Sequence, residues 1–428
     1  MKAIDTHRTI DAIWRIESTR LIAGLARMVR DVGLAEDLAQ DALLVALEKW
    51  PEIGIPDNPG AWLMAAAKRK AIDQMRRQKR LERKYEELGR ESESQGASAF
   101  DEVLEGDIGD DILRLIFTTC HPILSPEARV ALTLRLLGGL TTSEIARAFL
   151  VPEPTVAQRI VRAKRTLTEA RVPFEMPEGA DREARLVSVL EVLYLMFNEG
   201  YVATSGGSWL KPTLCFEALR LGRILAAAAP GESEVHGLAA LMEIQSSRFR
   251  ARVGPSGEPI LLLDQNRALW DHLLIRRGLA ALERAKQSGR ALGPYALQAA
   301  IAACHAKAGT AAETNWIRIA ALYDALSRVA PSPVVEINRA VALSMAFGPE
   351  VGLEVVDALA AEPSLKEYHL LPGVRGDLLA KLGRNEEARE EFLRAAALTR
   401  NERERSVLLN RAAECSGHDQ VPDSEGSS

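Results

Sequence analysis

Hydrophobic and polar residues follow one another along this chain with a period of three to four, which is the period of an amphipathic α-helix. The clearest example runs from 140 to 167, where Pro152 and Pro154 separate two helical segments because proline cannot continue a helix interior. The second segment repeats apolar residues at this spacing, at Val156, Ile160, Ala163 and Leu167. No stretch alternates with the period of two that is typical of a β-strand. The pattern therefore predicts an all-α protein.

The first of these two segments opens on a predicted capping box. Thr141 lies three residues before Glu144, so each side chain can bond the other residue's backbone amide at a helix start. Two short helices that meet near Val151 predict a helix-turn-helix. The second helix has a polar and cationic face opposite its apolar one, formed by Thr155, Gln158, Arg159, Arg162 and Arg165. This layout suits a helix in the major groove of DNA, although a solvated helix in an ordinary hairpin has the same pattern.

A second basic segment lies near the N-terminus, from Trp62 to Lys84. Its lysines and arginines greatly outnumber its acids, which are Asp73 and Glu82. Apolar residues at helical spacing would anchor this segment, so its basic side chains would project outward and bind phosphates with release of counterions. The candidate nucleic-acid-binding residues are Trp62, Lys68, Arg69, Arg76, Arg77 and Arg80. A core-anchoring role for Trp62 is the alternative.

The preceding segment, Leu34 to Trp50, has the opposite character. Polar and acidic residues recur on one side at spacings of three and four, at Asp37, Gln40, Asp41 and Glu48. An acidic helix face disfavours DNA and suits a basic protein partner, although a plain solvated face is a common alternative.

Composition narrows the choice of function. The formal net charge of the 428 residues is −5, so any binding of nucleic acid has to come from local basic surfaces. The four cysteines are widely spaced and form no CxxC pair, which argues against a disulfide framework and a zinc site. No apolar run approaches the ~20 residues that span a bilayer, and the first residues lack the apolar core of a signal peptide. We expect a cytoplasmic protein without membrane contact, metal or cofactor.

The pattern of helical segments and acidic or polar stretches also predicts how the chain divides into domains. The predicted parts are a first helical domain at 1–85, an acidic flexible linker at 86–110, the helix-turn-helix domain at 111–172, a helical middle domain at 183–285, helical repeats at 290–415 and a disordered tail at 416–428. In the repeats, Leu343 followed by Gly348 resembles Leu379 followed by Gly383, close to the ~34-residue period of tetratricopeptide (TPR) hairpins. Such hairpins usually bind protein or peptide segments, and structural packing alone is the alternative.

The order of these motifs along the chain is more specific than any one motif alone. An acidic helix, a basic helix that begins at Trp62, an acidic linker and a helix-turn-helix follow one another over roughly residues 13–171. This order resembles the extracytoplasmic-function (ECF) sigma factors of bacterial RNA polymerase. With the TPR-like extension, the chain resembles the ECF42 group of that family, in which the fused extension is expected to regulate or assist the factor.

The resemblance implies a role for each segment. The acidic helix would belong to sigma region 2 and dock on the clamp helices of the polymerase β′ subunit. The basic helix would recognise and melt the −10 element of the promoter, and the helix-turn-helix would be region 4 and read the −35 element. Two positions depart from the family pattern. Arg69 stands where many members have asparagine, and Leu150 occupies a turn position that glycine often fills.

Three hypotheses follow for function. The first is a sigma factor that binds core RNA polymerase and promoter DNA and catalyses nothing itself. The second is a stand-alone helix-turn-helix regulator with a TPR sensor domain, which would bind duplex DNA tightly without polymerase. The third is an enzyme in the C-terminal half that uses Glu199 and His236, but no nucleophile motif, phosphate loop or metal spacing supports it.

Overall fold

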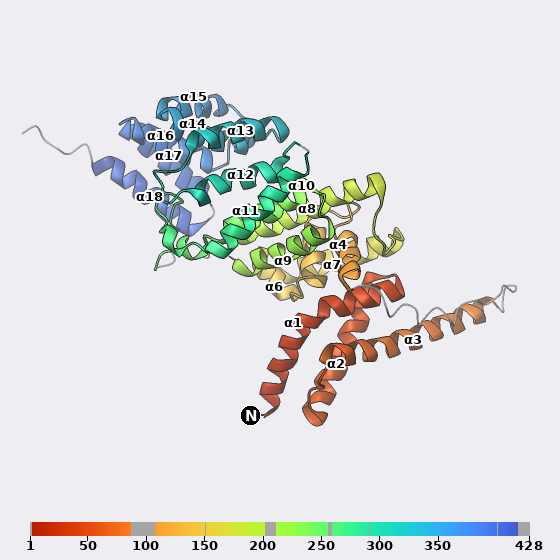
Figure 1. Ribbon diagram of the computed structural model, residues 1–428. Helices are drawn as coiled ribbons and strands as arrows, with labels where there is room; N and C mark the ends of the chain where they lie inside the picture. Colours follow the sequence, from red (N-terminus) through yellow and green to blue (C-terminus); the bar gives the residue numbers. More distant parts are fainter. Residues whose placement is uncertain are drawn as a thin grey trace, which may run out of the picture. The chain divides into compact units, whose positions relative to one another are not determined.

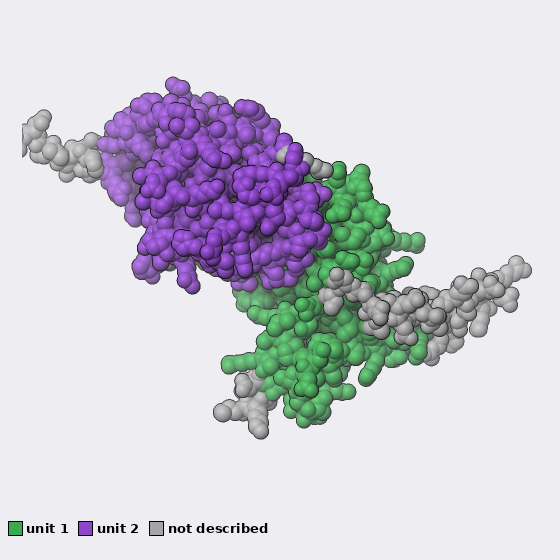
Figure 2. All heavy atoms as spheres, viewed as in Figure 1, with its two compact units in different colours: residues 1–195 green, residues 196–428 purple. Residues whose placement is uncertain are grey.

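α-Helices dominate the secondary structure of the protein, and the described part of the chain contains no β-strand (Figure 1). The computed structural model describes residues 2–86, 108–149, 151–201, 211–255, 259–289, 291–399 and 401–417. The predicted all-α class is therefore confirmed. The chain forms two compact units, residues 1–195 and 196–428, which Figure 2 colours separately. Of the predicted acidic linker at 86–110, residues 87–107 lie outside the described residues, as does most of the predicted tail; residue 86 belongs to α3 and residues 108–110 to α4.

The first unit begins with three long helices, α1 (Lys2–Val29), α2 (Val32–Ile53) and α3 (Pro59–Glu86), which pack on one another. Asp31 starts α2, because its side chain accepts a hydrogen bond of 2.8 Å from the Leu34 amide. The largest side chain of this core is Trp50, which meets the ring of Trp62 edge to face with a centroid distance of 5.3 Å. Full burial of a large apolar side chain contributes about 1.5–3 kcal/mol, so the contact between Trp50 and Trp62 stabilises the packing of α2 on α3.

The remaining helices of the first unit include the helix-turn-helix. They are α4 (Ile108–Thr119), α5 (Pro126–Leu136), α6 (Thr142–Phe149), α7 (Glu153–Glu169) and α8 (Gly179–Tyr201), the last of which continues into the second unit. The predicted capping box of α6 is confirmed. The Thr141 amide donates to the Glu144 carboxylate at 2.8 Å, and the Glu144 amide donates to the Thr141 hydroxyl at 3.1 Å. The predicted apolar stripe of α7 is buried. Leu150 lies outside the described residues.

The second unit is a series of packed helices. They are α9 (Pro212–Ala228), α10 (Ser233–Ser246), α11 (His272–Gln287), α12 (Pro294–Lys307), α13 (Trp316–Val329), α14 (Pro333–Phe347), α15 (Pro349–Leu359), α16 (Leu370–Lys381), α17 (Asn385–Leu398) and α18 (Glu402–Gly417). Nearly all of α10 is buried, because α9, α11 and α12 pack around it. From α13 onward each helix packs on the next. Gly348 ends α14, and Gly383 lies just after the end of α16. Their φ values of 111° and 75° are ones that glycine adopts without steric cost.

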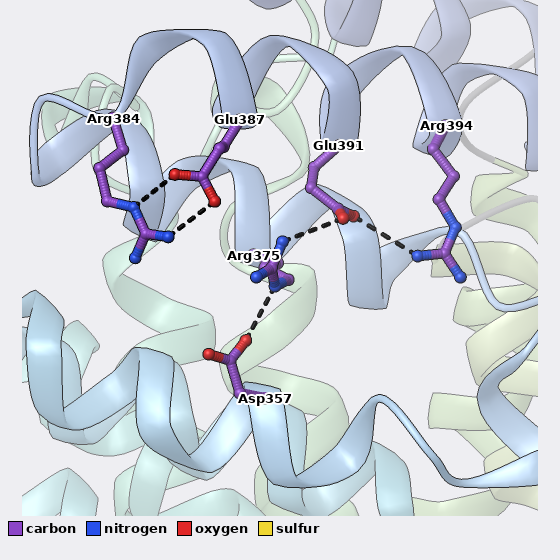
Figure 3. Close-up of polar contacts among 6 residues, drawn as sticks. All are labelled: Asp357, Arg375, Arg384, Glu387, Glu391 and Arg394. Carbon is purple, nitrogen blue, oxygen red and sulfur yellow. Dashed lines mark hydrogen bonds and ion pairs between the residues drawn. The ribbon is translucent and has the colours of Figure 1, made fainter.

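Ion pairs add to the apolar contacts between the last helices. Arg375 of α16 donates to Asp357 of α15 at 2.8 Å and to Glu391 of α17 at 3.1 Å, as Figure 3 shows. Arg394 also approaches Glu391, at 3.7 Å, and Arg384 pairs with Glu387 at the start of α17. Arg375 therefore links three successive helices, although each surface pair contributes only about 0–1 kcal/mol.

Candidate nucleic-acid interface

The outward face of α7 carries the predicted upstream DNA-binding residues. Gln158, Arg162 and Arg165 are exposed, while Thr155 and Arg159 are half-buried. Arg165 holds Glu169 at 2.6 Å one turn along the helix. Both side chains of that pair are largely exposed, so a phosphate can replace Glu169 at little cost. The face is therefore accessible and cationic, as base and phosphate contacts in a major groove require.

The predicted basic helix is α3, and its described part is anchored as the sequence analysis expected. Leu63, Ala67 and Ala71 are buried, and Arg69 and Arg76 are exposed. Partial burial, and then the nearby Arg27, lower the pKa of Lys68. The side chains of Arg77 and Arg80 lie outside the described part of α3. The exposed arginines leave this helix with a basic surface.

Trp62 occupies an intermediate position on α3. Its ring packs edge to face against the buried Trp50, yet the residue is half-buried rather than enclosed. The contact with Trp50 supports the core-anchoring alternative for Trp62. The uncovered part of the ring still leaves a surface for a base to stack on.

The acidic residues of α2 have different environments. The Asp37 side chain is 72% exposed and lies 3.6 Å from the Lys164 ammonium group. Asp41 pairs with Lys70 of α3 at 3.0 Å, and Gln40 donates to Glu36 at 2.7 Å. Glu48 is exposed. A basic partner would therefore find Asp37 and Glu48 exposed, and the Asp41 side chain 46% exposed beside Lys70.

Glu36 is a key residue that the sequence analysis missed. It is only 3% exposed; its carboxylate accepts a hydrogen bond from Arg135 of α5 at 2.6 Å and forms an ion pair with Lys164 of α7 at 2.5 Å. Burial raises the pKa of Glu36, but these two cations outweigh it, so the net pKa lies below the ordinary value. The sequence did carry a signal of this burial, since Glu36 lies among the apolar residues Ala35 and Leu38. A charge on the buried side of a helix needs a partner.

Further polar contacts join the first three helices to the helix-turn-helix domain within the first unit. The Thr19 hydroxyl donates to the Leu137 carbonyl at 2.8 Å, in a buried position. The Thr168 hydroxyl donates to Asp31 at 2.7 Å. One side of α7 therefore packs against α2 and its cap, while the predicted DNA-binding side faces outward.

The enzyme hypothesis named Glu199 and His236 as its candidate side chains. Glu199 is paired with Lys211 at 2.7 Å, and the His236 ring bonds the Pro230 carbonyl at 2.9 Å, so the two proposed catalytic side chains have different partners. Among the described residues, no cluster of three or more histidine, cysteine or acidic side chains could hold a metal ion. None of the described helices is long and apolar enough to cross a membrane.

Three family models match this chain. Sigma-70 region 2 matches residues 16–81, which include α2 and most of α3, and sigma-70 region 4 matches residues 114–167, which include the helix-turn-helix. A family of unknown function, DUF6596, matches residues 185–286.

Three individual proteins resemble the chain, one over nearly its whole length and two over less than half of it. The chain is 43% identical over 388 residues to the uncharacterized protein R00370 of Rhizobium meliloti, covering 90% of this chain and 91% of that protein. It is 30% identical over 158 residues to the ECF RNA polymerase sigma factor SigK of Mycobacterium ulcerans, covering 35% of this chain and 78% of SigK. It is 25% identical over 176 residues to the probable ECF RNA polymerase sigma factor SigI of Mycobacterium tuberculosis, covering 41% of this chain and 60% of SigI. No solved structure matches the chain.

Proposed function

Since the chain belongs to the ECF RNA polymerase sigma factors, we propose that it binds core RNA polymerase and directs the enzyme to a set of promoters. The observation that carries this proposal is the presence, in one compact unit, of an acidic helix, a basic helix and a helix-turn-helix in that order. A stand-alone regulator needs the helix-turn-helix but has no use for the acidic helix.

Each surface has its own role in this proposal. Asp37, Gln40, Asp41 and Glu48 of α2 face the polymerase. The basic side chains of α3 grip the −10 element and the opened strand, with Trp62 at the start of that helix. On α7, Thr155 and Gln158 contact base edges of the −35 element, and Arg159, Arg162 and Arg165 contact phosphates or bases.

The C-terminal half has a regulatory role in this proposal. Its successive helix pairs, with glycine at positive φ after α14 and before α17, support TPR-like hairpins that bind a protein or peptide segment. Because the half is covalently attached to the sigma domains, even a weak contact with them acts at high effective concentration. The fused half thereby modulates the activity of the factor without a separate membrane protein.

Reconstituted transcription tests the function. Purified full-length protein with core polymerase should start run-off transcription from genomic fragments that core polymerase alone does not transcribe. If the protein fails to bind core polymerase but binds duplex DNA tightly alone, it is a stand-alone regulator and the proposal is wrong.

Two variants test the assignment of surfaces. Asp41→Arg should weaken binding to core polymerase, with Glu350→Arg on the exposed start of α15 as the matched charge reversal. Arg162→Ala should leave core binding intact and weaken upstream promoter contact about five- to hundredfold, since one DNA contact contributes about 1–3 kcal/mol. Arg389→Ala, at an exposed position of α17, is its control. The opposite pattern would contradict the assignment.

A further inference from the structure

A cavity of about 580 Å³ in the first unit has no role in the function described so far. Its walls come from the end of α1, the start of α2, α4, the end of α7 and the segment 171–175 that follows α7. A volume of roughly 300–1,000 Å³ is typical of small-molecule sites. The cavity is therefore large enough for a nucleotide.

Arginines dominate the polar part of the wall. Arg27, Arg30, Arg114 and Arg171 all line the cavity, whereas the acids of the lining are Asp31 and Glu175. Arg27 and Arg114 are held from behind by the buried Asp111, at 3.3 and 2.8 Å. Within the described part of the chain, Arg30 and Arg171 make no side-chain ion pair. These two guanidinium groups are available to an anion.

The backbone at Arg30 and Arg171 is unusual. They are the two non-glycine residues with positive φ in the described chain, at 54° and 48°. Both follow the end of a helix, α1 and α7, at a position that glycine usually fills because a side chain there is strained. Both also line the same cavity. Residues with a strained backbone cluster at functional sites. The shared cavity therefore favours a common ligand for Arg30 and Arg171 over the view that each merely ends its own helix.

The rest of the wall suits an aromatic base. Pro173 and Phe174 line the cavity, and Phe174 is only half-buried, so an aromatic face remains uncovered. Base stacking on such a face contributes about 1–3 kcal/mol in nucleic-acid-binding proteins. Cationic groups and an aromatic face in one cavity match the two ends of a nucleotide.

We propose that this cavity binds a nucleoside polyphosphate, with the phosphates held by Arg30 and Arg171 and the base against Phe174. The bound ligand then connects α1 and α2 with α4 and α7, because the residues that line the cavity come from both groups of helices. If the chain acts as a sigma factor, as proposed above, the bound ligand holds α7 on α2 and lowers the affinity for core polymerase.

Binding to the full-length protein is measured by isothermal titration calorimetry with GDP, inorganic pyrophosphate and guanosine as separate probes. GDP should bind one to one and more tightly than either of the other two. Pyrophosphate binding as tight as GDP would overturn the contact with the base. Guanosine binding as tight as GDP, or no binding of GDP, would overturn the phosphate site.

Glycine variants separate a ligand role from a structural one. Arg30→Gly and Arg171→Gly should each weaken GDP binding about tenfold or more, since each removes a charge-assisted contact. Neither should lower the melting temperature of the free protein, because glycine adopts positive φ without strain. If these arginines only stabilise the ends of their helices, the glycine variants should instead lower the melting temperature and leave GDP binding unchanged. Arg389→Ala controls for the loss of an exposed arginine elsewhere.

The effect on polymerase is measured separately. GDP should weaken core binding by the wild-type protein and leave core binding by Arg30→Gly unchanged. If GDP binds and core affinity does not move, the coupling is wrong. If the protein does not bind core polymerase even without GDP, the proposed function fails while the calorimetric result on the nucleotide site stands.

Discussion

Replacing Glu36 by glutamine should raise the affinity of the protein for core RNA polymerase by about a hundredfold. Glu36 holds Lys164 of α7 and Arg135 of α5 against α2, and Lys164 also lies 3.6 Å from the predicted polymerase-facing Asp37. The helix-turn-helix domain therefore sits on the flank of the surface that we expect polymerase to use. A variant that releases it exposes that surface.

The magnitude follows from the contacts of the carboxylate. The Glu36 carboxylate accepts a hydrogen bond from Arg135 at 2.6 Å and forms an ion pair with Lys164 at 2.5 Å, and each such charge-assisted contact contributes about 1.5–3 kcal/mol. The lower value applies because the Arg135 and Lys164 side chains are 24% and 20% exposed and regain water when released. Two contacts then contribute about 3 kcal/mol, a factor of about a hundred in the equilibrium between closed and open arrangements. The full effect on affinity is reached when nearly all free protein is closed.

The assay is a titration of fluorescently labelled protein with core polymerase, followed by anisotropy. Lys164→Met is the matched variant, because it removes one of the two contacts from the α7 side and leaves every α2 residue intact. It should raise affinity about tenfold, and the double variant should gain less than the product of the two single effects, since both variants break the same contact.

Unchanged affinity in both variants would mean that the contact does not compete with polymerase. A lower affinity in Glu36→Gln together with a higher one in Lys164→Met would mean that Glu36 itself binds polymerase.

Two further predictions concern stability. Gly383→Ala, at φ 75° with open space around the new Cβ, should cost about 1 kcal/mol. Gly376→Ala should cost more, about 1–3 kcal/mol, because its Cβ would lie 3.0 Å from the Phe392 ring and 3.1 Å from the Ala388 carbonyl. Thermal unfolding of both variants checks this order, and equal costs would contradict it. Burial, and then Arg248 and Arg267, lower the pKa of His305 to about 4, so the folded protein favours the neutral ring. The contribution of His305 to the free energy of unfolding is fully present above the unfolded pKa of about 6.5. It falls as the pH drops towards 4, by at most about 3 kcal/mol. His305→Asn should flatten the pH dependence of the melting temperature between pH 7 and 4.5, and an unchanged slope would show that other groups cause it.

The confirmed sequence predictions concern features that lie within a few residues of one another. The capping box of Thr141 and Glu144 forms as predicted, and so does the buried stripe of α7. Residues three or four apart in a helix share a face whatever the rest of the chain does, so their pattern can be read directly. The same reasoning located the basic surfaces of α3 and α7. Their contacts with DNA stay a prediction.

The residue pattern was enough to predict the helical class, the order of acidic helix, basic helix and helix-turn-helix, and which face of α7 is cationic. The pattern did not show that the buried Glu36 pairs with Arg135, a residue 99 positions away, or that Arg30 and Arg171 line one cavity, because both facts depend on how the helices pack. A helical pattern shows which side of a helix is buried but not what covers it. The partner of a buried charge depends on how distant helices pack, and no local spacing encodes that.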